Sequence, residues 1–292
     1  MPGEEDAELT RSAEMAGAFE VERVSIELTQ RCKKACWFCY NESHPKGGTE
    51  FRPNEVMAFV RDLAAHGVRA VSFGGGEPLE YEGVFDILHE LRGIIFRSLT
   101  TNGLPLRDER VVAALAAAAP DKAHISIHFP NRKSEVLRVI SQVAMLQAHG
   151  IRSGVNLLVA RSSLGAARDA VMCLDEAGIG PDRRVLLPMR GRDTPCAAEL
   201  AQVAGGSMFQ SMTCLLNCGK SPRFCAIGWD KSVAWCSYTS ERRPLESLTY
   251  AALTTALANL GVTFCGGIDD TDTFIRHGLS SRTQHGRDLV RR

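Results

Sequence analysis

Apolar residues along this chain alternate between two kinds of segment: short strand-like runs and longer stretches with helical periodicity. The stretch 53–67 has Pro53 near its start and Gly67 just past its end, which are the favoured positions of these residues at helix boundaries. Its apolar stripe consists of Val56, Phe59, Val60 and Leu63. Two further helical stripes consist of Val84, Ile87, Leu88 and Leu91, and of Val136, Val139, Ile140 and Val143.

The strand-like runs begin near Val21, Val68, Ile95, Lys122, Ile151 and Arg184, and each of the first five is followed by an amphipathic stretch. Six strand and helix units in succession predict an α/β fold with a parallel sheet covered by helices. Eight units would be needed to close a barrel. Composition alone does not distinguish an open barrel from a flat doubly wound sheet.

The pattern changes after residue 213. Residues 224–229 and 233–238 read as two strands of a hairpin around 230–232, and a helix is expected over 248–260 with Ser247 as its cap and Gly261 as its stop. The chain therefore divides into a flexible lead-in (1–20), a core domain (21–212), a small C-terminal domain (213–270) and a flexible basic tail (271–292).

Composition narrows the class of protein. The formal net charge is zero over 292 residues, so nothing favours nucleic acid or an anionic membrane as a partner. The N-terminus lacks the pattern of a secretory signal, and charged residues interrupt every apolar stretch before it reaches the length of a membrane span. Ten cysteines in such a chain favour reduced, metal-binding thiols and a cytoplasmic location.

Three cysteines, Cys32, Cys36 and Cys39, follow the first strand at C-x3-C-x2-C spacing. A loop of this kind can direct three thiols at one soft metal centre. Three thiolates leave one iron of a 4Fe–4S cluster open for another ligand. The alternative is a structural zinc site, which requires four protein ligands and for which His44 is the candidate fourth.

The cysteine triplet, with its aromatic residue before Cys39, and the glycine run Gly74-Gly75-Gly76-Glu77-Pro78 one strand later resemble the radical S-adenosylmethionine (SAM) superfamily. The resemblance implies an open, partial (β/α)6 TIM-like barrel. It also implies that the open iron binds SAM, whose reductive cleavage gives a 5′-deoxyadenosyl radical that abstracts hydrogen from a substrate. The cofactor would then carry out the radical chemistry, and the protein would bind the reactants and shield the radical from side reactions.

The resemblance also implies roles for individual residues. The turn Gly74, Gly75, Gly76 and Glu77 would hold the methionyl amino group, and Phe38 would pack on adenine. The carboxylate and ribose of SAM would be reached by Asn102, Ser126, His128 and Asn156. Ordinary strand-end polarity and plain core packing remain the alternatives for these residues. Arg190 or Arg192, after the sixth strand, is a candidate to bind a carboxylate.

A second group of cysteines follows. Cys218, Cys225, Cys236 and Cys265 are similar in arrangement to the SPASM and twitch extensions of radical SAM enzymes, which implies one auxiliary 4Fe–4S cluster in a hairpin and helix cap. Zinc is an alternative for four thiolates. Cys214 either replaces Cys218 as a ligand or is a catalytic thiol that returns a hydrogen atom.

The function expected from the sequence is that of a radical SAM oxidoreductase or maturase. Its substrate is expected to be a ribosomally made peptide that is oxidised or cross-linked, with a small natural-product intermediate (an aminocyclitol, a sugar or an amino-acid derivative) as the alternative. The expected electron donor is a flavodoxin or ferredoxin. A non-catalytic zinc or iron–sulfur scaffold is the alternative of a different class, and the intact glycine run argues against it.

Overall fold

The computed structural model describes residues 21–206, 214–216, 218–221 and 223–266. The predicted lead-in (1–20) and all of the predicted tail (271–292) lie outside the described residues, as does the predicted domain boundary at 212.

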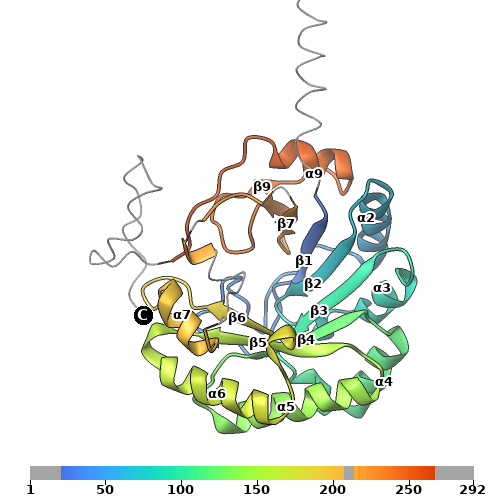
Figure 1. Cartoon of the computed structure of the whole chain (residues 1–292). Coiled ribbons are helices and arrows are strands. Elements are labelled where there is room, and N and C mark those ends of the chain that lie inside the picture. The colour runs from blue at the N-terminus through green and yellow to red at the C-terminus, as the bar shows by residue number, and fades with distance from the viewer. Residues whose placement is uncertain (1–20, 207–213, 217, 222, 267–292) are drawn as a thin grey trace, which may run out of the picture.

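The core is one sheet in which six strands run parallel in the order β6-β5-β4-β3-β2-β1. These strands are β1 (Arg23–Thr29), β2 (Ala70–Gly75), β3 (Phe96–Thr101), β4 (Lys122–Ile127), β5 (Ser153–Val159) and β6 (Arg184–Pro188). The sheet curves into an open arc with the helices on its outer side (Figure 1). The predicted partial (β/α)6 barrel is confirmed.

The connecting helices are α2 (Pro53–Ala65), α3 (Val84–Glu90), α4 (Glu109–Ala118), α5 (Lys133–Ala148) and α6 (Leu164–Glu176), followed by α7 (Ala197–Val203). The predicted apolar stripe of α2 is fully buried against the sheet. Gly67 follows α2 with φ +91°, a conformation that side chains with a Cβ disfavour. Helix α2 therefore begins and ends near the proline and glycine residues that predicted its boundaries.

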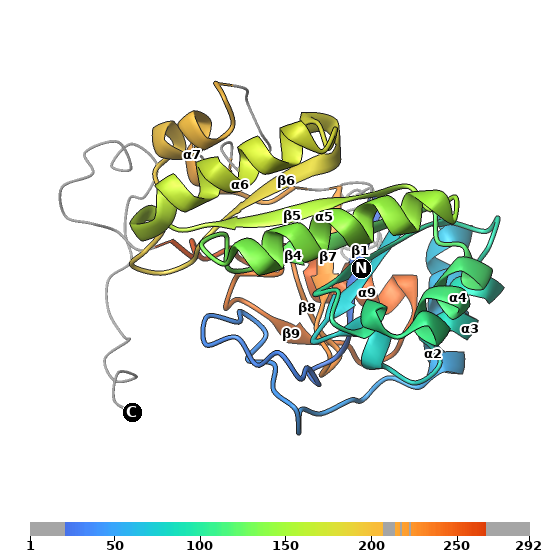
Figure 2. The same ribbon diagram turned by 90° about the horizontal axis from the view of Figure 1, so that it is seen from below.

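The C-terminal segment adds three strands to the same sheet. They are β7 (Phe224–Ile227), β8 (Ser232–Ala234) and β9 (Arg243–Pro244). β7 pairs in parallel with β1, while β8 and β9 continue antiparallel. The hairpin is thus hydrogen-bonded to the edge of the barrel sheet. Figure 2 shows the loop after β1 in blue beside the orange segment of β8 and β9.

Details of this segment differ from the prediction. The second hairpin strand ends at Ala234, four residues before the predicted position 238. The helix α9 (Tyr250–Leu257) is capped by Thr249, whose side chain accepts a hydrogen bond from the Ala252 amide, and not by Ser247. Ser247 contacts the Thr249 hydroxyl instead. Among the described residues, no helix is long and apolar enough to cross a membrane.

Candidate active site

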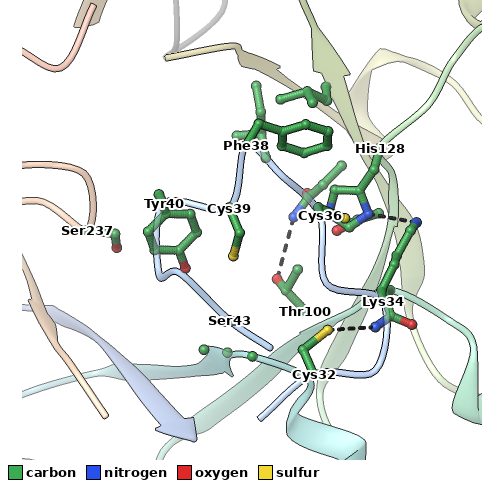
Figure 3. A pocket seen from close by; sticks show the side chains of 18 of the residues that line it. Cys32, Lys34, Cys36, Phe38, Cys39, Tyr40, Ser43, Thr100, His128 and Ser237 are labelled. Carbon is green, nitrogen blue, oxygen red and sulfur yellow. Dashed lines mark hydrogen bonds between the residues drawn. The ribbon is translucent and has the colours of Figure 1, made fainter. Parts of the chain in front are cut away.

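A cavity of about 260 Å³ lies at the carboxyl ends of the strands, where parallel barrels gather their functional groups. Its wall combines the cysteine loop (residues 32–39), the ends of β2 to β6, and Ser237 and Tyr238 from the C-terminal segment. Cys32, Cys36 and Cys39 all line it, and Figure 3 shows their side chains around one space. The three thiols that the sequence singled out therefore share one cavity at this end of the barrel.

The cysteine loop is fixed to the barrel by Lys34. Its ammonium donates to Glu135 Oε1 at 2.9 Å and lies 2.9 Å from His128 Nδ1 (Figure 3). Glu135 also accepts the backbone N–H of His128 at 2.7 Å. Burial opposes ionisation of Glu135, but the hydrogen bond and charge of Lys34 hold its pKa below the usual value. A partly buried ion pair thus connects the loop between two cysteines to the end of β4.

The thiols lie in a partly desolvated environment. Burial raises the pKa of Cys32, and it raises the pKa of Cys36 to about 11. Asn102 Nδ2 donates to Cys32 Sγ at 3.5 Å. Metal binding must therefore displace protons from these thiols, as it does in thiolate sites generally.

The donor set distinguishes between two kinds of metal centre. Among the described residues, no three His, Cys, Asp or Glu side chains meet closely enough to hold a single metal ion. His44 is exposed and is not part of the cavity wall. In a 4Fe–4S cluster each thiolate ligates a different iron, so the donors surround the group instead of meeting at one point. Three thiols around one cavity fit such a cluster, and Cys32, Cys36 and Cys39 would hold it.

The glycine turn forms the adjacent wall. Gly74, Gly75 and Gly76 line the cavity, and nothing lies within 4 Å of the position that a Cβ of Gly74 would occupy. A Cβ on Gly76 would collide with the backbone carbonyl of Arg31 at the start of the cysteine loop. The turn is therefore packed directly against the cysteine loop and leaves backbone accessible to a ligand.

Glu77 has a different position from its glycine neighbours. It is fully buried and is not part of the cavity wall. Its carboxylate accepts hydrogen bonds from Thr101 Oγ1 (2.7 Å), the Asn102 amide (2.8 Å) and the Leu79 amide (3.1 Å). Burial raises the pKa of Glu77 to about 7, although these hydrogen bonds act in the opposite direction. Glu77 thus connects the glycine turn to the end of β3.

The remaining predicted SAM contacts, Phe38, Asn102, Ser126, His128 and Asn156, all line the cavity. Burial lowers the pKa of His128 to about 3, and the nearby Lys34 charge adds to this effect. His128 is therefore neutral. Because an ammonium group can only donate, His128 Nδ1 accepts and the ring proton is on Nε2.

Tyr40, Tyr238 and Arg190 form another part of the cavity wall, and only Arg190 among them was predicted from the sequence. The rings of Tyr40 and Tyr238 pack edge to face with centroids 4.8 Å apart, and the Arg190 guanidinium lies 3.9 Å from the Tyr238 ring centre. Arg190 Nε and Nη1 are buried without a hydrogen-bond partner among the described residues. Arg192, the other candidate, is exposed and is not on the wall. The tyrosines carried no motif by which sequence reasoning could have found them.

Among the C-terminal cysteines, Cys225 lies in a different environment from Cys218 and Cys265. Burial raises the pKa of Cys218 to about 11, and the neighbouring thiols of Cys214, Cys265 and Cys236 raise it further. The pKa of Cys265 is affected by Cys214 and Cys236 as well. Cys225 is fully buried in the hydrophobic core of the sheet, opposite Val24, and burial alone raises its pKa. The thiols of Cys214, Cys236 and Cys265 are therefore near enough to influence Cys218, whereas Cys225 is surrounded by the apolar core.

Glu27 is a buried carboxylate on β1, only 3% exposed, with Oε1 unpartnered among the described residues. Burial raises its pKa to about 7, so between pH 4.5 and 7 the folded protein binds a proton that the unfolded chain releases. Stability should therefore fall as pH rises through this window. Glu27→Gln should increase the free energy of unfolding of the metal-free protein by about 2–3 kcal/mol at pH 8, and by much less at pH 5.

Urea unfolding at the two pH values measures this difference. The control is Glu90→Gln, because the side chain of Glu90 is 53% exposed, and its effect should be small at both pH values. An equal effect of Glu27→Gln at pH 5 and pH 8 would show that the pKa of this carboxyl group is not raised by burial.

An open parallel barrel, a cysteine triplet after its first strand and a glycine turn after its second are the features in which this chain resembles radical SAM proteins. Residues 26–149 match the family model described as the Radical SAM superfamily. This segment, which is less than half of the chain, is thus similar to the radical SAM superfamily.

Curated relatives match less than half of this chain. A protein named Probable GTP 3′,8-cyclase from Thermococcus kodakarensis is 34% identical over 142 residues, which is 47% of this chain and 45% of that protein. A protein named PqqA peptide cyclase from Rhodopseudomonas palustris is 31% identical over 131 residues, 44% of this chain and 34% of that protein. The chain therefore spans less than half the length of these relatives.

Solved structures share the fold over a larger part of the chain. SuiB from Streptococcus suis bound to S-adenosylmethionine superposes with a TM-score of 0.61 at 15% identity, covering 78% of this chain and 64% of SuiB. The protein anSMEcpe with bound AdoMet and the Cp18Cys peptide gives a TM-score of 0.58 at 15% identity, covering 79% and 80%. At this identity the likeness is one of fold.

Proposed function

We propose that this protein is a radical SAM enzyme that cleaves SAM reductively and abstracts hydrogen from its substrate. The observation that carries the proposal is the meeting of three thiols and an open glycine turn in one cavity at the carboxyl ends of the strands. When bound, the cluster and SAM together supply the 5′-deoxyadenosyl radical. A non-catalytic scaffold has no need of a glycine turn that opens onto a cavity.

The roles of the chain's own residues follow from their positions. Backbone groups of Gly74, Gly75 and Gly76 bind the methionyl amino group, and Glu77 keeps the turn in place from behind. His128 Nε2–H and the polar side chains of Asn102, Ser126 and Asn156 bind the carboxylate and ribose. Phe38, which packs edge to face on Phe129 at 5.5 Å, provides the surface for adenine.

The second cysteine group holds one auxiliary 4Fe–4S cluster, with Cys214, Cys218, Cys236 and Cys265 as ligands. Their mutual electrostatic influence and the burial of Cys225 support this set over the one expected from sequence. Cys214 is then a ligand and not a hydrogen donor. An auxiliary cluster held by these thiols would supply an acceptor for an electron from the substrate radical. A structural zinc ion is the alternative that metal analysis distinguishes, although no three of the described thiols meet closely enough to hold a single ion.

The substrate is a peptide that undergoes oxidation or cross-linking. Support comes from the name of the PqqA peptide cyclase and from the peptide bound to anSMEcpe. Arg190, with two unpartnered nitrogens on the cavity wall, would bind a carboxylate of this peptide. The alternative is a small natural-product intermediate with an anionic group. A flavodoxin or ferredoxin supplies the electron, and the protein acts in the cytoplasm without a nucleic acid or membrane partner.

The test is metal analysis after anaerobic reconstitution, followed by an assay for 5′-deoxyadenosine with dithionite as reductant. We expect about eight irons per chain, for two four-iron clusters, together with deoxyadenosine formation. About four irons and one zinc would retain the radical chemistry but make the second site structural. Zinc alone, without SAM cleavage, would refute the proposal.

A further inference from the structure

The outer side of the cysteine loop carries a strongly basic depression. It is lined by Lys33, Trp37, Arg107, Arg132 and Arg138, with Cys36 half-buried in its wall. Cys36 lines the internal cavity as well. One residue therefore separates the depression from the space proposed to hold the cluster.

The charge of this basic depression is not neutralised locally. Glu135 is the acidic residue on its wall, and it pairs with Lys34 at 2.9 Å. The four remaining cations, Lys33, Arg107, Arg132 and Arg138, form no ion pair with any of the residues that the structure describes. Formal net charge over the whole chain is zero, so this is a local concentration of positive charge. Such a field attracts an acidic partner and accelerates its association.

An exposed aromatic residue lies among these charges. Trp37 is 81% exposed, and its ring packs edge to face on Phe38 at 5.3 Å. Phe38 in turn lines the internal cavity. An apolar residue surrounded by cations is typical of a surface that binds a protein partner, because aromatic side chains contribute strongly to interface affinity.

The basic depression has a clear limit. Beyond Arg107 the next hollow is lined by Glu80, Asp108 and Glu109 as well as by cations, and Asp108 pairs with Arg110 at 2.7 Å. The uncompensated charge is therefore concentrated over the cysteine loop. On the opposite side, the cavity is walled by Tyr238 and Arg190 and is the space assigned to SAM and substrate.

From these observations we propose that the basic depression docks an acidic electron-transfer protein of the flavodoxin class, which reduces the cluster through the short path past Cys36 and Trp37. The proposal rests on the proposed function and adds the place of electron entry. One electron leaves the reduced flavin of the partner and enters the oxidised cluster, so no further reactant is needed. The partner's acidic rim would pair with the four cations, and an apolar contact would cover Trp37.

The test compares two reductants on the reconstituted protein. Arg107 and Arg132 are both exposed, and the double variant Arg107→Glu/Arg132→Glu reverses two of the four charges. At low ionic strength it should lower the rate of SAM cleavage supported by reduced flavodoxin by about tenfold or more, and added salt should slow wild type towards the variant. Cleavage supported by dithionite, which needs no docking, should be unchanged.

A matched control is Arg69→Glu/Arg168→Glu, which reverses two exposed arginines outside the depression and should behave as wild type with both reductants. Arg107→Glu alone should give a smaller loss of the flavodoxin-supported rate. This single variant tests the proposal if the double variant misfolds. An unchanged flavodoxin-supported rate, or an equal loss with dithionite, would overturn the proposal. The proposal would also be overturned if the Arg107→Glu/Arg132→Glu variant no longer bound an acidic peptide such as poly-glutamate but kept the flavodoxin-supported rate of SAM cleavage. That result would identify the depression as a peptide site.

The dissociation constant of oxidised flavodoxin, measured by titration of each variant, gives a readout independent of SAM cleavage. We expect wild type and the control pair to bind and the Arg107→Glu/Arg132→Glu variant to bind about tenfold or more weakly. If dithionite yields no deoxyadenosine with wild type, the proposed function fails, and this titration still decides whether the docking surface exists.

Discussion

Cys36→Ala should reduce SAM cleavage to below detection while leaving a folded protein. Cys36 lies on the cavity wall, outside the hydrophobic core, so its removal should cost little packing. Two thiolates cannot replace three in holding a cluster with one open iron, and iron content should therefore fall by about four per chain. The measurements are 5′-deoxyadenosine with dithionite, iron content and circular dichroism.

Cys173→Ala is the matched control. Cys173 lies on α6, packed against the core and outside the cavity wall, and its alanine variant should retain both iron and SAM cleavage. Undiminished deoxyadenosine formation by Cys36→Ala would mean that the cysteine loop does not hold the reactive cluster. A loss in Cys36→Ala accompanied by unfolding would be resolved by Cys36→Ser, which nearly keeps the volume of the side chain.

A second pair of variants separates the two candidate ligand sets of the C-terminal segment. Cys236→Ala should remove about four of the eight expected irons per chain, because three thiolates would remain at the auxiliary site. Cys225→Ala should retain all the iron and instead lower the free energy of unfolding by about 1–2 kcal/mol, since it removes a fully buried side chain from the core. Iron analysis and urea unfolding of the reconstituted proteins give both values.

Cys214→Ala completes this comparison. It should match Cys236→Ala in iron loss if Cys214 is the fourth ligand, and it should retain eight irons if Cys214 is a catalytic thiol. Loss of iron in Cys225→Ala without loss in Cys214→Ala would restore the ligand set expected from the spacing. Zinc in place of the lost iron would instead identify the second site as structural.

Local sequence was sufficient for most of the barrel. The stripe of α2 and the runs of β1 to β6 follow from periodicity and punctuation, because each element buries one face against the same sheet. Their order along the chain also predicts where the carboxyl ends of the strands meet. The cysteine loop and the glycine turn could therefore be placed together from the sequence.

Side-chain roles inside this frame were less predictable. Glu77 belongs to the same turn as three cavity glycines, yet it points to Thr101 and the Asn102 amide behind the wall. Lys34 lies between two cysteines, and nothing in the sequence indicated that it would pair with Glu135, 101 residues away. Such contacts depend on how separate strands are brought together, which a single sequence does not reveal.

The strand and helix units of the parallel sheet, the cysteine triplet and the glycine turn could be predicted from the sequence, since each depends on residues that are close in the chain, whereas the open barrel was implied by the family resemblance. Tertiary structure alone decided which distant groups share a site. It placed Cys225 in the core, brought Cys214, Cys236 and Cys265 near enough to influence Cys218, and brought Tyr238 and Arg190 to the cavity. The physical reason is that pairing of β7 with β1 fixes which face each C-terminal residue presents, and this pairing joins strands about 200 residues apart.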